Sequence, residues 1–331
     1  MARVLLVAVK FFGYEQQIVD ALRAGGHEAD LLDERAFNSA LGRVILRRVP
    51  QLAGPATRLH FKRALADNRS LDVLLVLKGE NTPRWFIEEL QTRNPGLRTV
   101  FYTWDSLRNS GRAQELFDLF DRKISFDPAD VATRGDFDYV PLFHSPVFTG
   151  ARTKMVTRDL DLAFVGTLHS DRHAFVQRAT AGLPEARTSV RLYMQARWYY
   201  WVGRATGRFR GVRRYEVTFE KLELGDIASL FARSRAVLDM QRASQTGLTM
   251  RTFEVLAAGA GLVTTNSSIR DEPIYDTAYV LVVNPDADMR EDIDRFLAAL
   301  PDPSQIAASV DRYALDRWLD SVLNNALDGM E

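Results

Sequence analysis

Short apolar runs alternate with helical patterns along the first half of the chain. The segment 14–24 has helical spacing and ends at two glycines, Gly25 and Gly26, and Pro83 is typical of a helix start. The runs that predict strands are 4–9, 27–32, 73–77, 99–104, 123–126 and 139–142. Because alternating strands and helices form parallel sheets covered on both faces, this half predicts an α/β domain.

The second half restarts the same alternation after an interruption. Residues 145–157 carry Pro, Gly and charges without periodicity, which predicts a linker. A helix is expected at 227–231, and the strands expected are 160–165, 190–193, 215–219, 235–240, 262–265 and 279–283. The pattern therefore predicts two Rossmann-like domains, at 1–150 and 158–312.

A last helix is expected at 306–326 and carries Tyr313 and Trp318. Residues 313–331 either form an ordinary C-terminal helix with aromatic residues in the core or cross back to the N-terminal domain.

The stretch 239–268 carries the clearest chemistry. A polar loop at 241–247 follows a strand and precedes a helix that Gly259 and Gly261 end. The free N–H groups and the dipole at such a helix start favour a phosphate. Glu254 lies about one turn inside this helix, where its carboxylate can accept hydrogen bonds from a ribose.

This stretch resembles the nucleotide-sugar motif of GT-B glycosyltransferases. That motif has two Glu residues separated by seven positions and an Ala/Gly-rich helix end. Glu254 and the tail at 257–259 match it, whereas Thr246 occupies the position of the first Glu. The form Gly-Leu-Thr-Met-Arg-Thr-Phe-Glu is similar to CgeB-like and lipopolysaccharide- or capsule-type members, which often carry Arg-x-Phe-Glu. The resemblance implies the GT-B plan of two Rossmann-like domains that face each other across a cleft.

The resemblance implies that the C-terminal domain binds a nucleotide-sugar donor. Glu254 would hold the ribose, and the residues expected to line the phosphates and sugar are Gln245, Thr246, Gly247, Leu248, Thr249 and Arg251. The loop after the strand at 160–165 resembles the first loop of this domain in such enzymes. There Gly166 and Thr167 allow close approach of a phosphate, and Arg172 neutralises it. His169 is either a catalytic contact to the donor or an exposed loop histidine.

The acceptor is expected in the first half, at the loops that follow strands. Those loops hold Phe12, Gly13 and Tyr14, then Lys78 and Glu80, and then Asp105. Asp105 is either a catalytic base or a helix N-cap, and Lys78 and Glu80 are either site residues or a solvated pair. His144, near the expected linker, is a further candidate for the cleft.

Composition narrows the chemistry. The net charge is zero, which favours neither nucleic acid nor membrane globally, and Cys is absent, which fits a reducing cytoplasm. The first apolar run is too short for a signal peptide or a membrane span. Asp-x-Asp occurs at 136–138, 159–161, 286–288 and 292–294, but never after a long apolar strand. We therefore expect no metal and no cofactor, with the nucleotide sugar as co-substrate.

Two stretches combine Arg with apolar residues: 42–63 and 197–214. Such a composition fits a membrane interface, a sugar-stacking surface or a nucleic-acid site. It also fits an ordinary amphipathic surface with extended arginines. Because no nucleic-acid motif occurs, we expect no nucleic-acid partner, and residues 197–214 remain a candidate for peripheral contact with the inner face of a membrane.

These observations predict a metal-independent glycosyltransferase that moves a sugar from a nucleotide-sugar donor to a glycan or lipid-linked acceptor in cell-surface polysaccharide biosynthesis. Two alternatives remain. A nucleotide-sugar epimerase of the same fold would need carboxylates on both sides of the sugar. A non-catalytic binding protein of two α/β lobes would bind a nucleotide or sugar without turnover.

Overall fold

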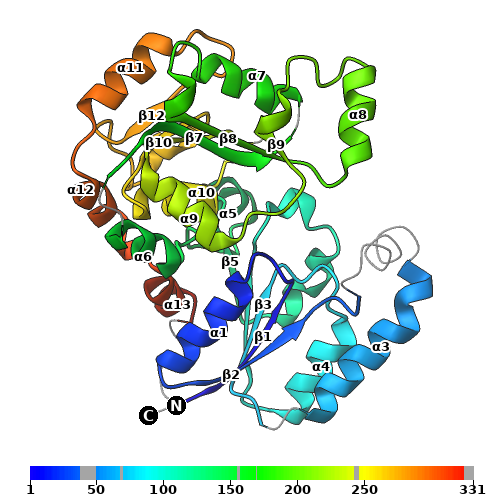
Figure 1. Cartoon of the computed structure of the whole chain (residues 1–331). Coiled ribbons are helices and arrows are strands. Elements are labelled where there is room, and N and C mark those ends of the chain that lie inside the picture. Colours follow the sequence, from blue (N-terminus) through cyan, green and yellow to red (C-terminus); the bar gives the residue numbers. More distant parts are fainter. Residues whose placement is uncertain (38–49, 68–69, 155–156, 169, 242–245, 324–331) are drawn as a thin grey trace. The chain divides into compact units, whose positions relative to one another are not determined.

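A computed structural model describes residues 1–37, 50–67, 70–154, 157–168, 170–241 and 246–323. The chain divides into two compact units. The first comprises Met1–Pro141 together with Leu315–Glu331, and the second comprises Leu142–Ala314. Each unit contains one six-stranded parallel sheet flanked by helices, as the hydrophobic pattern predicts (Figure 1).

The sheet of the first unit has the strand order β2-β1-β3-β4-β5-β6. Its strands are β1 (Arg3–Ala8), β2 (Glu28–Asp33), β3 (Val73–Leu77), β4 (Arg98–Tyr102), β5 (Arg122–Ser125) and β6 (Asp138–Tyr139). Every residue of β3 is fully buried, as expected for a central parallel strand covered on both faces. All six strands run in the same direction, so their carboxyl ends meet along one side, which we call the first carboxyl edge.

Helices cover both faces of this sheet. They are α1 (Tyr14–Ala24), α3 (Pro50–Asp67), α4 (Arg84–Arg93), α5 (Pro128–Arg134) and α13 (Leu315–Leu323). The last of these lies beside α1 (Figure 1), and its Trp318 ring packs edge-on against Tyr102 at a centroid distance of 5.0 Å. Arg122 also donates hydrogen bonds to the Ser321 and Val322 carbonyls. The C-terminal helix is therefore an integral part of the first unit.

The sheet of the second unit has the order β12-β11-β10-β7-β8-β9 and defines a second carboxyl edge in the same way. Its strands are β7 (Leu160–Thr167), β8 (Thr188–Tyr193), β9 (Val217–Thr218), β10 (Ser234–Asp239), β11 (Gly261–Thr264) and β12 (Val280–Val282). The helices α7 (Ser170–Ala179) and α11 (Arg290–Ala299) cover one face, and α6 (Pro146–Lys154), α9 (Leu224–Arg233) and α10 (Met250–Ala257) cover the other (Figure 1).

Two further helices complete the second unit: α8 (Arg197–Ala205), near β9, and α12 (Pro303–Ala308), against α10. The core under α7 and α11 contains Leu162 and Phe164 of β7 and Leu238 of β10. Side chains alternate along a strand, so Val165 and Asp239 lie on the opposite face, which α10 covers.

Two expectations about the connections are wrong. The segment 145–157 contains the helix α6, whose Phe148 packs against Phe231 of α9 at a ring distance of 5.8 Å. Its amphipathic signal is weak because Phe148 is the only buried residue that the described helix contributes. The second expectation, one helix over 306–326, fails because the chain bends between α12 and α13. Ala314 pairs there with His144, and the chain passes from the second unit to the first.

Candidate functional site

Between β10 and α10, the described residues 240–241 and 246–249 are held by several hydrogen bonds. The Gln241 amide donates to the Gly247 carbonyl at 2.9 Å, and the Asn266 amide donates to the Thr246 carbonyl at 3.2 Å. The backbone N–H of Gln241 donates to Thr265 Oγ1 at 3.1 Å. The bonds to Thr265 and Asn266 join these described residues to the segment directly after β11, so the residues that lead into α10 are held at the second carboxyl edge.

The start of α10 presents polar groups of the kind that an anion needs. Thr249 occupies the N-cap position with extended backbone, yet its side chain makes no capping hydrogen bond. Its Oγ1 is buried and has no hydrogen-bond partner among the described residues. The unpaired N–H groups and the dipole of a helix N-terminus attract negative charge. Thr249 is thus available to a ligand at the point where the helix favours a phosphate.

Two arginines extend towards the same edge. Arg251, in the first turn of α10, donates through Nη1 to the Val165 carbonyl of β7, and its guanidinium lies 5.4 Å from the centre of the Phe231 ring. Its buried Nε has no hydrogen-bond partner in the described part of the chain. Arg172, in α7, donates through Nη1 to the Thr167 carbonyl at 3.4 Å. Both guanidinium groups therefore lie at the end of β7.

Gly166 leaves room for the Phe164 ring beside these arginines. A Cβ atom built there would lie 2.8 Å from Phe164 Cζ and 3.6 Å from Arg172 Nη1. A side chain at this position would collide with the Phe164 ring and enter the space next to Arg172. The Phe164 ring therefore occupies the space that a side chain at this position would need.

Asp239, the last residue of β10, completes this group. Its carboxylate is 8% exposed, and burial raises its pKa, while Arg251, Arg172 and a hydrogen bond from Thr264 act in the opposite direction. One of its oxygens, Oδ2, is buried without a hydrogen-bond partner among the residues described. Because β7 and β10 are neighbours, this carboxylate can hold both arginines at the strand ends. It was missed as a site residue, although a polar residue at the end of a buried strand is a usable signal.

Glu254 lies one helical turn after Arg251 on the same face of α10. Its side chain is 4% exposed, which is rare for a carboxylate. The helix ends shortly afterwards at Gly259, which has φ = +72° and leaves no room for a Cβ, since such an atom would lie 2.7 Å from the Pro303 carbonyl. The Ala/Gly-rich tail therefore lets α10 end close to α12.

The structure brings most of the expected donor residues together. Along the ends of β7 and β10 and the start of α10 lie Gly166, Thr167, Arg172, Thr246, Gly247, Leu248, Thr249, Arg251 and Glu254. Leu248 is 2% exposed and serves the core. His169 and Gln245 lie outside the described residues. His144 is 3% exposed and is bonded to the backbone of residues 310 and 313, so it joins two segments of the second unit.

The expected acceptor residues gather at the first carboxyl edge. Lys78 follows β3 with φ = +77°, and its Nζ lies 3.5 Å from Asp105 Oδ2, which follows β4. Glu80 has a buried Oε1 with no hydrogen-bond partner in the described chain. Burial raises the pKa of Glu80, while Lys78 and Arg112 oppose the shift. An ammonium group and two carboxylates are therefore close together at this edge.

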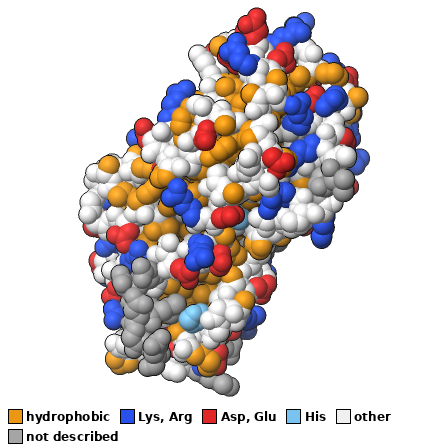
Figure 2. Space-filling model, turned by 90° about the vertical axis from the view of Figure 1, so that its left-hand side faces the viewer, with side chains coloured by type: hydrophobic (Ala, Val, Ile, Leu, Met, Phe, Trp, Pro, Cys, Tyr) orange, Lys and Arg blue, Asp and Glu red, His pale blue; other side chains and the backbone are white. Residues whose placement is uncertain are grey.

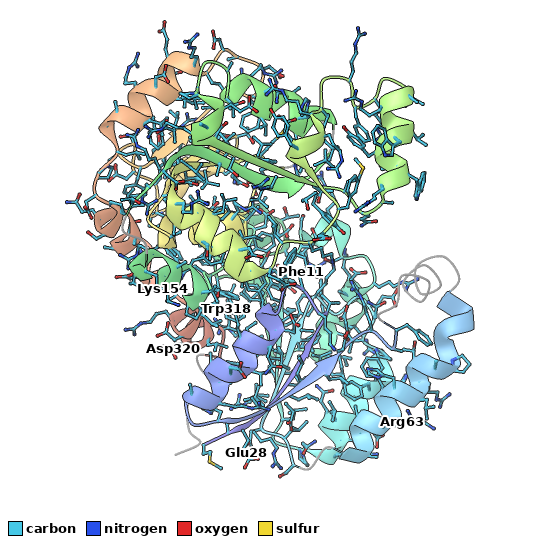
Figure 3. All side chains as sticks on the ribbon, in the orientation of Figure 1. Phe11, Glu28, Arg63, Lys154, Trp318 and Asp320 are labelled. Carbon is cyan, nitrogen blue, oxygen red and sulfur yellow. The ribbon has the colours of Figure 1, made fainter. Side chains whose placement is uncertain are left out.

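Aromatic side chains lie beside these charges. Phe11 and Phe12 are 47% and 46% exposed, and Phe11 stacks on Tyr14 at a centroid distance of 6.2 Å. Phe11 lies at the carboxyl end of β1 next to the start of α1 (Figure 3). Phe12 and Gly13 both have positive φ, at +54° and +79°. A Cβ at Gly13 would meet no other atom, so the positive φ is the reason that a glycine suits this position. Exposed aromatic rings of this kind suit the apolar faces of sugars.

Glu34 is a further member of this edge that sequence reasoning missed. It follows β2, is fully buried, and accepts hydrogen bonds from the Asn81 amide at 3.0 Å and the Thr82 hydroxyl at 3.4 Å. Burial raises its pKa to about 7, against opposing effects of Asn81, Arg35 and Lys78. Its position directly after a strand was the available signal.

Among the described residues, no group of three or more His, Cys, Asp or Glu side chains is arranged to hold a metal ion. No helix in the described ranges is both long and apolar enough to cross a bilayer.

Residues 172–321 match a protein-family model described as "Glycosyl transferase-like". No curated protein matches the chain. Among solved structures, the chain is similar to AviGT4, a glycosyltransferase involved in avilamycin A biosynthesis, with a TM-score of 0.63, 17% identity and coverage of 98% of this chain and 97% of that one. It is also similar to Anabaena Alr3699/HepE in complex with UDP-glucose, with a TM-score of 0.62, 13% identity and coverage of 98% and 99%.

A trehalose-6-phosphate synthase, OtsA, is similar as well, with a TM-score of 0.65, 13% identity and coverage of 99% of both chains. At these identities the likeness establishes the fold, and the family match covers the part of the chain that contains Arg172, Arg251 and Glu254.

Proposed function

We propose that this chain, which has the GT-B fold, is a glycosyltransferase that transfers a sugar from a nucleotide-sugar donor to a glycan or lipid-linked acceptor in cell-surface polysaccharide biosynthesis. The observation that carries the proposal is the convergence of Arg172, Arg251 and Thr249 at the second carboxyl edge, where buried polar atoms lack partners among the described residues. Two guanidinium groups and a helix N-terminus form a site for a diphosphate.

The donor would bind with its diphosphate at this group and its ribose at Glu254. One of the solved structures with the same fold contains UDP-glucose, which supports a nucleotide sugar as the donor. Asp239 would act as a positioning residue, since it faces both arginines from the end of β10. Because no metal is required to neutralise a diphosphate held by two arginines, we propose that the enzyme works without one.

The acceptor would bind at the first carboxyl edge, with its sugar rings against Phe11 and Phe12. In the transfer step the bond between the anomeric carbon and the phosphate oxygen breaks, and a bond from an acceptor hydroxyl oxygen to that carbon forms. Asp105 takes the hydroxyl proton, and Lys78, 3.5 Å away, orients this carboxylate. Arg172 and Arg251 stabilise the negative charge on the departing nucleoside diphosphate.

A thermal-shift screen of nucleotide sugars tests the proposal. A ligand at one hundred times its Kd stabilises the protein by about 2.7 kcal/mol, so one donor class should raise the melting temperature clearly. Arg251→Ala should lose that rise, whereas Arg295→Ala, on the exposed side of α11, should retain it.

Products identify the class of activity. Release of the nucleoside diphosphate with the sugar on an acceptor supports transfer. Conversion of the donor's sugar without release indicates an epimerase, and stabilisation without any turnover indicates a binding protein. If the nucleotide sugar raised the melting temperature of Arg251→Ala as much as that of the wild type, Arg251 would not be part of the donor site.

A further inference from the structure

Helix α8 of the second unit exposes large apolar side chains that the donor site does not use. Trp198, Trp201 and Val202 are 68%, 61% and 49% exposed. They occupy positions i, i+3 and i+4, so they lie on one face of the helix. The helix stands beyond β9, at the end of its sheet (Figure 1). A solvent-facing pair of tryptophans is unusual for a soluble surface and indicates an interaction site.

The opposite face of α8 fixes the helix firmly to its unit. Tyr200 is 1% exposed, and its hydroxyl donates to the Val212 carbonyl at 3.4 Å. Gly203 lies against the Phe209 ring so closely that a Cβ atom would approach it to 2.1 Å. Tyr200, Phe209 and Val212 all belong to the main core of the unit. The exposed tryptophans are therefore carried on a well-packed helix.

The charge of α8 and the loop after it is mostly basic. Residues 186–215 contain eight arginines and neither Asp nor Glu, although the whole chain has a net charge of zero. Acidic residues flank this stretch, and one of them, Glu185, pairs with Arg213 at 3.4 Å. Six of these arginines belong to α8 and the loop after it, and all six are exposed: Arg197, Arg204, Arg208, Arg210, Arg213 and Arg214. Elsewhere on the second unit, acidic and basic side chains are mixed, as on the face that carries α11 (Figure 2).

Several of these arginines are held in place by aromatic rings. The guanidinium of Arg208 lies over Tyr199 at 5.6 Å, and those of Arg197 and Arg214 lie over Phe219 at 5.5 and 4.9 Å. These contacts leave the charges at the surface while fixing their positions. Cations therefore lie beside an apolar helix face, which is the arrangement of helices that rest in the plane of a membrane interface.

We propose that α8 and the loop after it dock on an anionic lipid leaflet. Trp198, Trp201 and Val202 enter the boundary between headgroups and acyl chains, and the surrounding arginines bind lipid phosphates and carboxylates. The positive charge of the arginines favours a negatively charged surface. The aliphatic side chain of Val202 on the apolar face favours a bilayer over a nucleic acid. This docking does not depend on the donor site and would hold an enzyme with a lipid-linked acceptor near its substrate.

Co-sedimentation with vesicles tests the docking. The whole chain should bind phosphatidylserine–phosphatidylcholine vesicles strongly and pure phosphatidylcholine vesicles weakly. Added salt should weaken the binding without abolishing it. Salt screens the attraction of the arginines to the lipid headgroups, but it does not remove the tryptophan side chains from the membrane interface. Lipids with brominated acyl chains should quench the tryptophan fluorescence of the bound protein.

Matched variants separate the two contributions. Arg208→Ser with Arg210→Ser should weaken binding roughly thirtyfold, since each cation near an anionic leaflet contributes about fivefold. Arg295→Ser with Arg317→Ser removes the same charge from exposed positions on α11 and α13 and should change binding little. Trp198→Ser with Trp201→Ser should abolish the binding that survives high salt and most of the quenching, with the melting temperature unchanged.

Three results would overturn the proposal. The first is a wild type that fails to sediment with anionic vesicles at low salt, and the second is equal binding to neutral and anionic vesicles. Alternatively, the wild type could self-associate without lipid while the tryptophan variant stays monomeric, which would assign the surface to a second copy of the chain.

Discussion

The two carboxyl edges are built alike and charged differently. Each is the end of a six-stranded parallel sheet with polar residues directly after the strands. The first edge collects carboxylates, Glu34, Glu80 and Asp105, around Lys78, whereas the second collects Arg172 and Arg251 around Asp239. The same backbone plan thus yields one edge rich in carboxylates and another rich in guanidinium groups.

Asp105 gives the largest expected effect on the first edge. Asp105→Asn removes the proposed base, so kcat should fall about 10²- to 10⁴-fold while donor affinity stays unchanged. Steady-state kinetics with a calorimetric measurement of donor binding checks both parts. As a control, Asp118→Asn breaks an exposed ion pair with Arg84 in the same unit and should leave kcat unchanged. A kcat close to that of the wild type would make Asp105 a structural residue.

Glu254 tests the second edge. Glu254→Gln weakens a charge-assisted hydrogen bond to the ribose, worth about 1.5–3 kcal/mol, so donor affinity should fall tenfold or more. The fold should survive, since glutamine has nearly the same shape. Calorimetric titration of the variant checks the loss, with Glu291→Gln on α11 as an exposed control. Unchanged donor affinity would exclude Glu254 from the site.

Glu34 predicts a pH dependence of stability that belongs to the first edge. Its pKa is about 7 in the folded protein and near 4.5 when unfolded, so the folded state holds the extra proton between these values. Its contribution to stability is therefore complete below the unfolded pKa and is lost as pH rises through about 7. Glu34→Gln should remove this loss and raise stability at pH 8 by up to about 3 kcal/mol.

Thermal unfolding across pH isolates the effect of Glu34. The melting temperatures of the variant and the wild type should be similar at acidic pH, move apart between about pH 4.5 and 7, and differ by a constant amount above that range. A difference that stays the same through that range would show that Glu34 does not titrate in it. Asn81 and Thr82 can both bond to glutamine, so the substitution preserves the local contacts.

Metal removal has the smallest expected effect. If the two arginines neutralise the diphosphate, activity in excess EDTA should equal activity in its absence. An assay of sugar transfer with and without magnesium or manganese checks this. Loss of activity in EDTA that either metal restores would contradict the metal-free proposal.

Local patterns predicted most of the fold. The helix at 14–24 and the strand at 73–77 form with the predicted bounds because helical periodicity and a continuous apolar run are properties of neighbouring residues. The helix α6 was not predicted because its described part buries only Phe148, and the break between α12 and α13 depends on a pairing with the distant residue His144. Tertiary contacts determine both the helix α6 and this break, so neither is predicted by the pattern of neighbouring residues.

The candidate site follows the same division. Arg172, Arg251 and Thr249 were predicted from the resemblance of a loop and a helix start to GT-B motifs, and the structure brings them to one edge. Glu34 and Asp239 were missed because their only sequence signal is a position at or just after the end of a strand, which many carboxylates without a site role share. Their burial and their neighbours become visible only when the sheet order places adjacent strand ends together.

The most direct measurement is a calorimetric titration that compares the affinities for nucleoside diphosphates and for the matching nucleosides. It is made on the wild type and on the double variant Arg172→Ala, Arg251→Ala. The account predicts that the diphosphate binds the wild type far more tightly than the nucleoside does. In the double variant, the two affinities should become nearly equal, while nucleoside binding stays at its wild-type level. An unchanged preference for the diphosphate in the double variant would contradict the claim that the second carboxyl edge binds the donor through these arginines.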